Sequence, residues 1–164
     1  MTASGGGIEV RAATSADVPA ILAFIEALAA YEKLSHEVRA TQADLARDLF
    51  GPDPKVFCDL AWRGDAPVGF AVWFHTYSTF VGAHGIYLED LFVTEAARGT
   101  GAGLALMRNL ARRCATGGFG RLEWAVLDWN TPALDFYAAL GASAPDGWLS
   151  RRLDGAALKR LAEA

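Results

Sequence analysis

The stretch Tyr87–Leu104, YLEDLFVTEAARGTGAGL, constrains the fold more than any other part of the chain. It begins with an apolar run typical of a strand, continues through a short polar connection and ends in a glycine-rich turn followed by helix-forming residues. A helix that begins at such a turn presents unpaired backbone N–H groups and a partial positive charge. The sequence therefore predicts a strand, a loop suited to bind a phosphate or pyrophosphate, and a helix, in that order.

Composition and charge narrow the class of protein. With 164 residues, 52% of them hydrophobic and 21% charged, the chain has the size and composition of one globular domain, which we place at residues 8–164 after a flexible N-terminus at 1–7. The net charge of −4 and the lack of a basic run disfavour nucleic-acid binding. No segment approaches the about 20 apolar residues that span a bilayer, so we expect a cytoplasmic protein without membrane contact. Cys58 and Cys114 fit packing positions better than a disulfide or a metal site.

The periodicity of apolar residues predicts an α/β (α+β) fold, in which antiparallel strands come first and strand–helix–strand units follow. The expected strands are 8–11, 56–62, 67–77, 86–93, 121–127 and 148–153, and the expected helices are 14–31, 41–50, 101–116, 133–140 and a short one after Asp154. Because the strand at 67–77 is apolar on both faces, it should be central in the sheet. Arg108, Arg112 and Arg113 fall on the outer side of the 101–116 helix and predict a solvated face.

Spacing separates the possible phosphate-binding loops. A P-loop would need a lysine after Gly103, and a dinucleotide fingerprint would need a third glycine where Leu104 and Leu106 stand. The remaining pattern is Arg98-x-x-Gly101-x-Gly103. Taken by itself, this pattern fits a cofactor loop and a purely structural glycine-rich turn equally well.

Four motifs in the same order and similar spacing decide between these readings: YEKL from Tyr31, YLEDLFV from Tyr87, RGTGAG from Arg98, and WNTPALDFYAALGA from Trp129. Together they resemble the GNAT (Gcn5-related) N-acetyltransferase superfamily, and within it the diamine (spermidine/spermine) N-acetyltransferases and their thialysine-acetylating relatives. The resemblance implies the GNAT fold, a mixed, mostly antiparallel central sheet of six to seven strands flanked by helices. Two of these strands would splay apart to form the CoA cleft.

The resemblance also implies acetyl-CoA as cosubstrate, with no metal. Backbone groups of the strand end would pair with the pantetheine arm, and the glycine-rich loop would hold the pyrophosphate. The cofactor-binding residues that match the family are Leu91, Phe92, Val93, Arg98, Gly99, Thr100, Gly101, Ala102, Gly103, Leu104, Asn130, Pro132 and Tyr137.

Two residues are candidates for proton transfer. An aliphatic amine has a pKa near about 10.4, so it must lose a proton before it can attack a thioester. Glu89 lies in an apolar strand beside the loop. The resemblance implies that Glu89 acts as a base through an ordered water. The alternative is a structural role, in which Glu89 pairs with an arginine or a backbone N–H. Alternation places Glu89 and Asp90 on opposite faces. Tyr137 matches the family's acid, although an isolated tyrosine here would be a half-buried helix residue.

The acceptor is less well specified. Tyr31, Glu32, Glu89 and Asp146 match the acidic amine channel of the family, but Ser78 and Thr79 stand where strict polyamine enzymes have Asp-Pro. The expected acceptor is therefore a small cationic amine, whether diamine, polyamine or lysine analogue, attacked directly in a ternary complex. The resemblance further implies a homodimer. Two alternatives stay open: an acetyl-CoA-binding regulatory domain without turnover, and a protein N-terminal or lysine acetyltransferase.

Overall fold

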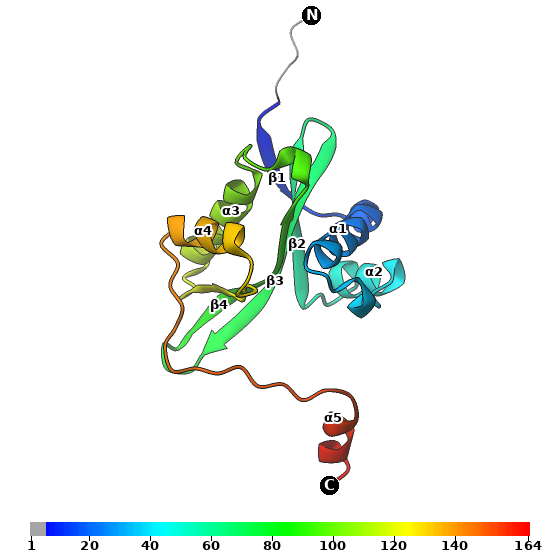
Figure 1. Ribbon diagram of the computed structural model, residues 1–164, viewed down its shortest axis with the longest axis vertical. Coiled ribbons are helices and arrows are strands. Elements are labelled where there is room, and N and C mark those ends of the chain that lie inside the picture. The colour runs from blue at the N-terminus through cyan, green and yellow to red at the C-terminus, as the bar shows by residue number, and fades with distance from the viewer. Residues whose placement is uncertain (1–5) are drawn as a thin grey trace, which may run out of the picture. The chain divides into compact units, whose positions relative to one another are not determined.

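A computed structural model describes residues 6–164 of the chain (Figure 1). The chain divides into two compact units, one made of the described residues up to Ala125 and the other of Val126–Ala164, and each is described by itself. The first contains β1 (Ile8–Ala12), α1 (Val18–Tyr31), α2 (Gln42–Phe50), β2 (Val56–Arg63), β3 (Ala66–Ser78), β4 (Ala83–Val93), α3 (Ala102–Gly117) and β5 (Leu122–Trp124). The second contains α4 (Thr131–Ala139) and α5 (Gly155–Ala162). Most of the N-terminal segment predicted to be flexible lies outside the described residues.

The sheet has five strands in the order β1-β2-β3-β4-β5. The first four are antiparallel to their neighbours, and β5 is parallel to β4. The mixed, mostly antiparallel sheet and the central position of β3 are confirmed, but the expected count of six to seven strands is wrong. In the described residues the 148–153 segment pairs with no strand, and the strand expected over 121–127 is reduced to Leu122–Trp124. Apolar residues give a segment strand propensity, but a strand also needs a ladder partner.

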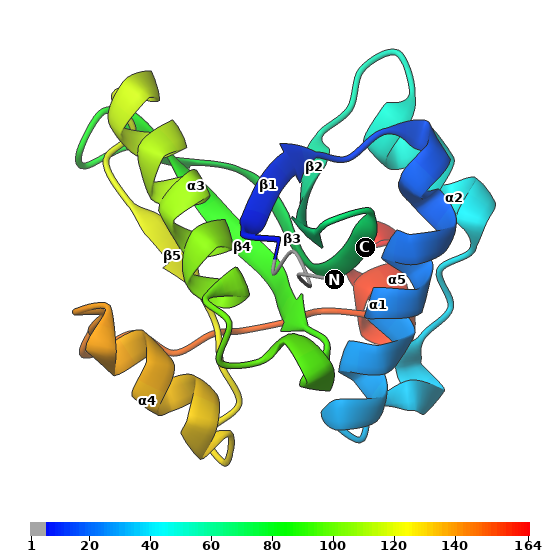
Figure 2. The same ribbon diagram turned by 90° about the horizontal axis from the view of Figure 1, so that it is seen from above.

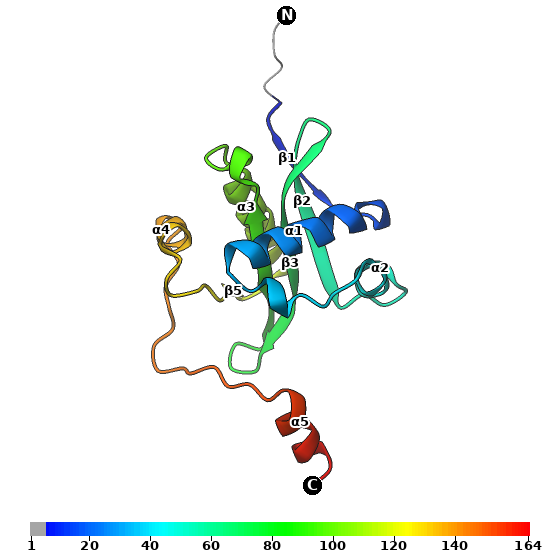
Figure 3. The same ribbon diagram turned by 45° about the vertical axis from the view of Figure 1, so that its right-hand side comes forward.

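Helices cover both faces of this sheet. In Figure 3, α1 lies in front of the strands, and in Figure 2, α3 lies on the other side of the sheet from α1 and α2. The core between the sheet and the α1–α2 layer joins residues from both helices to β2 and β3: Ile21, Phe24, Leu49, Leu60, Phe70 and Val72. Burial of this apolar surface is the main force that holds the layers together.

The start of α2 and the end of α1 follow from local chemistry. Thr41 caps α2 in a capping box, because its Oγ1 accepts the Asp44 N–H at 3.2 Å while Asp44 Oδ2 accepts the Thr41 N–H at 3.0 Å. The predicted start of α2 is thereby confirmed. After Tyr31 the chain turns sharply, with Lys33 in the left-handed region at φ 62°.

The α3 face of the sheet contains an ion pair between a buried carboxylate and a half-buried arginine that the sequence did not predict. Asp59 is 1% exposed, and its carboxylate accepts hydrogen bonds from Arg113 Nη2 at 2.6 Å and from Trp73 Nε1 at 2.9 Å. The Arg113 guanidinium also lies 5.1 Å from the Trp73 ring centroid. The prediction of a solvated face therefore holds only in part for Arg113, because the buried carboxylate on β2 draws its guanidinium inward while 38% of the side chain stays exposed.

The second unit is built around α4. Asn130 is buried and caps this helix, since its Oδ1 accepts the Ala133 N–H at 3.4 Å. Pro132 lies in the first turn, where a missing N–H has no consequence for the helix. Gly141, with φ 83°, follows the end of the helix. This start and end match the sequence prediction.

Candidate active site

The site in the first unit begins where β4 and β5 part. These two strands pair only from Ile86 to Leu88, whereas β4 continues along β3 to Val93. The Thr94 N–H donates to Val68 O at 2.9 Å, so Thr94 and Val68 form a hydrogen-bonded pair. In an antiparallel ladder, hydrogen-bonded pairs alternate with pairs whose N–H and C=O groups point away from the partner strand. Counting back from Thr94, Val93 and Leu91 belong to pairs of this non-bonded kind. Their N–H and C=O groups therefore face the edge of β4 beyond the end of its pairing with β5.

A β-bulge lies where this open edge begins. In the β3–β4 ladder Leu88 is opposite Trp73 and Asp90 is opposite Val72, so Glu89 is an extra residue without an opposite partner. Unbroken alternation, on which the opposite-face prediction for Glu89 and Asp90 depended, does not hold here. The shift places Asp90 opposite Val72, a residue of the α1–α2 core. Bulges redirect side chains, and this one redirects a carboxylate toward α1.

Two neighbouring carboxylates act on Asp90 at this point. Burial, followed by repulsion from Glu89 and Glu32, raises the pKa of Asp90 from 3.8 to about 6. Burial also raises the pKa of Glu32, which directly follows the last residue of α1. Glu89 is exposed. The pKa of Tyr87 is raised first by burial of the Tyr87 hydroxyl and second by the negative charge of Glu89. Glu32 and Glu89 thus both lie close enough to Asp90 to raise its pKa. Their roles in an acceptor site stay predictions.

Sequence reasoning missed Asp90. The signal was present, since an aspartate in the apolar run LEDLFV has to be explained by partners or by function. Strict alternation assigned Asp90 to the face away from Glu89, and only the bulge reverses that assignment.

The glycine-rich loop connects β4 to α3 as predicted. Gly101 is the N-cap of α3 with φ 89°, and Gly99 has φ 76°, so both adopt backbone conformations that other residues rarely take. A Cβ at either glycine would meet no atom within 4 Å. The first N–H groups of α3, from Ala102 to Leu104, have no carbonyl within the helix to bind. They form the positive end of a 16-residue helix.

Arg98 is engaged within the protein. Its Nε donates to Val93 O at 3.3 Å, and its guanidinium carbon lies 5.0 Å from the Tyr31 ring centroid and 6.0 Å from that of Phe92. Its backbone N–H donates to Glu95 O at 3.1 Å. Arg98 therefore joins the glycine-rich loop to the end of α1, where Tyr31 and Glu32 lie.

The other predicted site residues belong to the second unit. Asn130 and Pro132 lie at the start of α4, and Tyr137 is half-buried on α4 beside Phe136, with 5.3 Å between ring centroids. Asp146 is exposed in the segment after α4. Their roles toward the first unit stay predictions.

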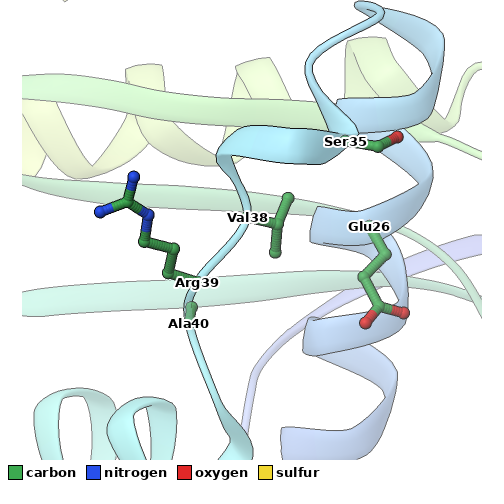
Figure 4. A pocket seen from close by; sticks show the side chains of 5 residues that line it. All are labelled: Glu26, Ser35, Val38, Arg39 and Ala40. Carbon is green, nitrogen blue, oxygen red and sulfur yellow. The ribbon is translucent and has the colours of Figure 1, made fainter.

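A further pocket opens between α1 and the connection to α2 (Figure 4). Its lining consists of Glu26, Ser35, Val38, Arg39 and Ala40, none of which belongs to the predicted site. In the figure the Arg39 guanidinium points away from the Glu26 carboxylate, so the charged groups do not converge on one ligand. Residues 6–164 contain no group of three potential metal ligands and no helix long and apolar enough to cross a membrane.

The first unit thus combines an open strand edge, a glycine-rich helix start and a group of carboxylates. Comparisons with known proteins identify a family for this chain. A model of the acetyltransferase (GNAT) family matches residues 21–142. The chain belongs to this family. The thialysine N-epsilon-acetyltransferase of Mus musculus is 35% identical over 164 residues, which cover 93% of this chain and 96% of that protein. The spermidine/spermine N(1)-acetyltransferase-like protein 1 of Homo sapiens is 34% identical over 150 residues, 85% of this chain but 21% of that protein.

Solved structures agree with this assignment. An integron cassette protein from the mobile metagenome of V. cholerae superposes with a TM-score of 0.80 at 29% identity, covering 98% of this chain and all of that one. The protein is thus a GNAT-type N-acetyltransferase of the branch that contains the thialysine and spermidine/spermine enzymes. The fold and the family predicted from the four motifs are confirmed.

Proposed function

We propose that this GNAT enzyme transfers the acetyl group of acetyl-CoA to a primary amine of a small cationic acceptor. The observation on which this depends is the concentration of Glu32, Glu89 and Asp90 at the point where the open edge of β4 begins. The open edge of β4 and the loop before α3 suit acetyl-CoA, and the carboxylates suit a positively charged substrate. Glu89 lies between this cofactor half and this acceptor half of the proposed site.

Cofactor binding rests on backbone groups. The outward N–H and C=O groups of Leu91 and the outward N–H of Val93 offer a strand-like partner to the amide groups of a pantetheine arm, while the Val93 C=O accepts from Arg98 Nε. The N–H groups of Ala102, Gly103 and Leu104, together with the dipole of α3, would hold the pyrophosphate. Open space at Gly99 and Gly101 lets an anionic group come close to the backbone. In the second unit Asn130 and Pro132 are the proposed additional contacts.

The carboxylates attract the acceptor, and one of them must then remove its proton. A protonated amine is favoured by a cluster of negative charge but has no lone pair for attack. Glu89 is exposed at the bulge and is the proposed base, directly or through a water. Glu32, Tyr31 and Asp146 are the proposed acceptor contacts. Burial and, after it, the charges of Glu89 and Glu32 raise the pKa of Asp90, and a cationic amine bound nearby would offset the contribution of these charges.

Transfer is proposed to occur in one step. The amine nitrogen attacks the thioester carbonyl, the C–S bond breaks, and Tyr137 supplies a proton to the departing thiolate. A covalent acetyl-cysteine is disfavoured because burial raises the pKa of both the Cys58 and the Cys114 thiols. The homodimer and the cytoplasmic location expected from the sequence stay predictions.

Steady-state acetyl transfer to a panel of spermidine, putrescine, thialysine, ornithine and lysine tests the proposal, with Glu89→Gln as the critical variant. We expect turnover of at least one of these amines, and a loss of about 10²- to 10⁴-fold in Glu89→Gln at neutral pH. The loss should shrink toward the pKa of the free amine, where unprotonated acceptor is already present. Glu95→Gln, an exposed acid after the same strand, is the matched control.

Three results would contradict the proposal. Binding of acetyl-CoA without turnover of any amine would favour a regulatory domain. A Glu89→Gln variant with the wild-type rate at pH 7 would remove Glu89 from the role of base. Turnover of a peptide but of no small amine would identify a protein acetyltransferase instead.

A further inference from the structure

Arg98 lies at the junction of the two proposed halves of the site. Its side chain is extended between the Val93 carbonyl, where Nε donates at 3.3 Å, and the Tyr31 ring, whose centroid is 5.0 Å from the guanidinium carbon. A guanidinium over an aromatic face is attracted by the negative face of the ring. Arg98 thus bridges two elements that are far apart in the sequence.

On the α1 side, Arg98 contacts a turn that needs support. Tyr31 ends α1, Glu32 follows it, and Lys33 has φ 62°, the only positive φ among the non-glycine residues of 6–164. Such a conformation persists when its surroundings hold it in place. The Lys33 and Leu34 N–H groups donate to the carbonyls of Ala30 at 3.2 Å and Ala29 at 2.7 Å. The ring contact with Arg98 holds the same turn from outside the helix.

On the other side, Arg98 is part of the connection to the glycine-rich loop. Its Nε occupies the Val93 carbonyl at the end of β4, and its N–H is bound to Glu95 O. The loop residues Gly99 to Gly101 follow immediately. A ligand that orders this loop would therefore also order the side chain that reaches Tyr31.

We propose that Arg98 is a positioning residue that couples the cofactor loop to the acceptor side of the site. Through Tyr31 it fixes the turn that presents Glu32, and acetyl-CoA bound at the loop tightens the binding of the cationic amine. This inference rests on the proposed function. It gives the Arg98 side chain a role different from direct binding of the pyrophosphate, the role that the sequence motif suggests.

Steady-state kinetics with both substrates varied separates these two roles. In Arg98→Met we expect the KM for the amine at saturating acetyl-CoA to rise about 3- to 10-fold, the effect of one cation–π contact and one charge-assisted hydrogen bond. The dissociation constant of acetyl-CoA from the free enzyme should change less than about twofold, because the coupling operates only when both substrates are bound. Tyr31→Leu should raise the KM for the amine by a similar factor, whereas Tyr31→Phe should retain the ring contact. The double variant Tyr31→Leu/Arg98→Met should raise this KM no more than the stronger single variant does. Arg108→Met, an exposed arginine on α3, is the matched control.

The kinetic result that overturns the proposal is equally specific. A rise confined to the KM for acetyl-CoA would assign the Arg98 side chain to the pyrophosphate. Additive effects of the Tyr31 and Arg98 substitutions would show that the two residues act independently.

Amide hydrogen exchange provides a readout that does not depend on turnover. The Lys33 and Leu34 amides should exchange faster in Arg98→Met than in the wild type or Arg108→Met, and CoA should slow them in the wild type only. Equal exchange in all three proteins, or no effect of CoA on these amides in the wild type, would overturn the coupling. A wild type that shows the exchange pattern but acetylates no amine would contradict the proposed function while leaving the link between Arg98 and the turn in place.

Discussion

Substitution of Asp90 by asparagine should make the protein more stable at neutral pH, although it removes a charge from the candidate site. Burial and the neighbouring Glu89 and Glu32 raise the pKa of Asp90 from 3.8 to about 6. The folded protein therefore binds this proton more tightly than the unfolded chain does. Stability is lost as the pH rises from about 4 through about 6, and above that range the loss is complete.

The size of the effect follows from the shift. One pKa unit corresponds to about 1.4 kcal/mol, so the ionised Asp90 destabilises the fold by up to about 3 kcal/mol at pH 8. Asparagine has nearly the same shape as protonated aspartate and carries no charge. Asp90→Asn should thus gain up to about 3 kcal/mol at pH 8 and almost nothing at pH 4.

Urea unfolding of both proteins at pH 4, 6 and 8 measures this difference, because titration of the other groups cancels between them. Glu26→Gln, which removes an exposed carboxylate from α1, should leave the difference near zero at each pH. If Asp90→Asn is less stable than the wild type at pH 8, a cationic or hydrogen-bonding partner stabilises the Asp90 carboxylate, and the description of this cluster as self-repelling is refuted.

Two further predictions concern the α3 side. Arg113→Met should lower the free energy of unfolding by about 2 kcal/mol, because it leaves Asp59 buried without its cation, although the partly exposed arginine is screened by solvent. Asp59→Asn/Arg113→Met should be less destabilised, and a loss below about 1 kcal/mol in urea unfolding for Arg113→Met would contradict this. Gly101→Ala should destabilise the protein by about 1–2 kcal/mol, because an alanine is strained at a φ of 89°. No steric clash adds to this strain, since a Cβ at this position meets no atom within 4 Å. An unchanged midpoint of urea unfolding would show that the loop relaxes.

Much of the candidate site was accessible from the sequence because its signals are local. The glycines before α3, the capping box at Thr41 and the Asn130 cap each depend on residues within one turn of the chain. Glu89 was identifiable as a carboxylate in an apolar strand beside the loop. Asp90 was not, because its direction depends on how β4 pairs with β3, and a bulge depends on the partner strand as well as on the strand that contains it.

The same distinction explains the predictions that were wrong in whole or in part. Arg113 has the helical position of a surface residue, and only the packing of α3 over β2 brings it to the buried Asp59. The 148–153 segment has the composition of a strand, yet it has no ladder partner among the described residues. Both outcomes depend on contacts between residues far apart in the chain, which side-chain periodicity does not encode.

By itself, then, the sequence determined the order of the elements, the loop between β4 and α3, and the acetyltransferase family, because short-range geometry and motif spacing are written along the chain. The splay of two strands was expected from the family resemblance, but tertiary structure alone decided that it begins after Leu88, that the bulge places Asp90 near Glu32 and Glu89, and that Arg98 reaches Tyr31. Each of these features depends on strand register or on packing between α1 and the sheet. Register and packing are set by the whole core, and no local pattern specifies them.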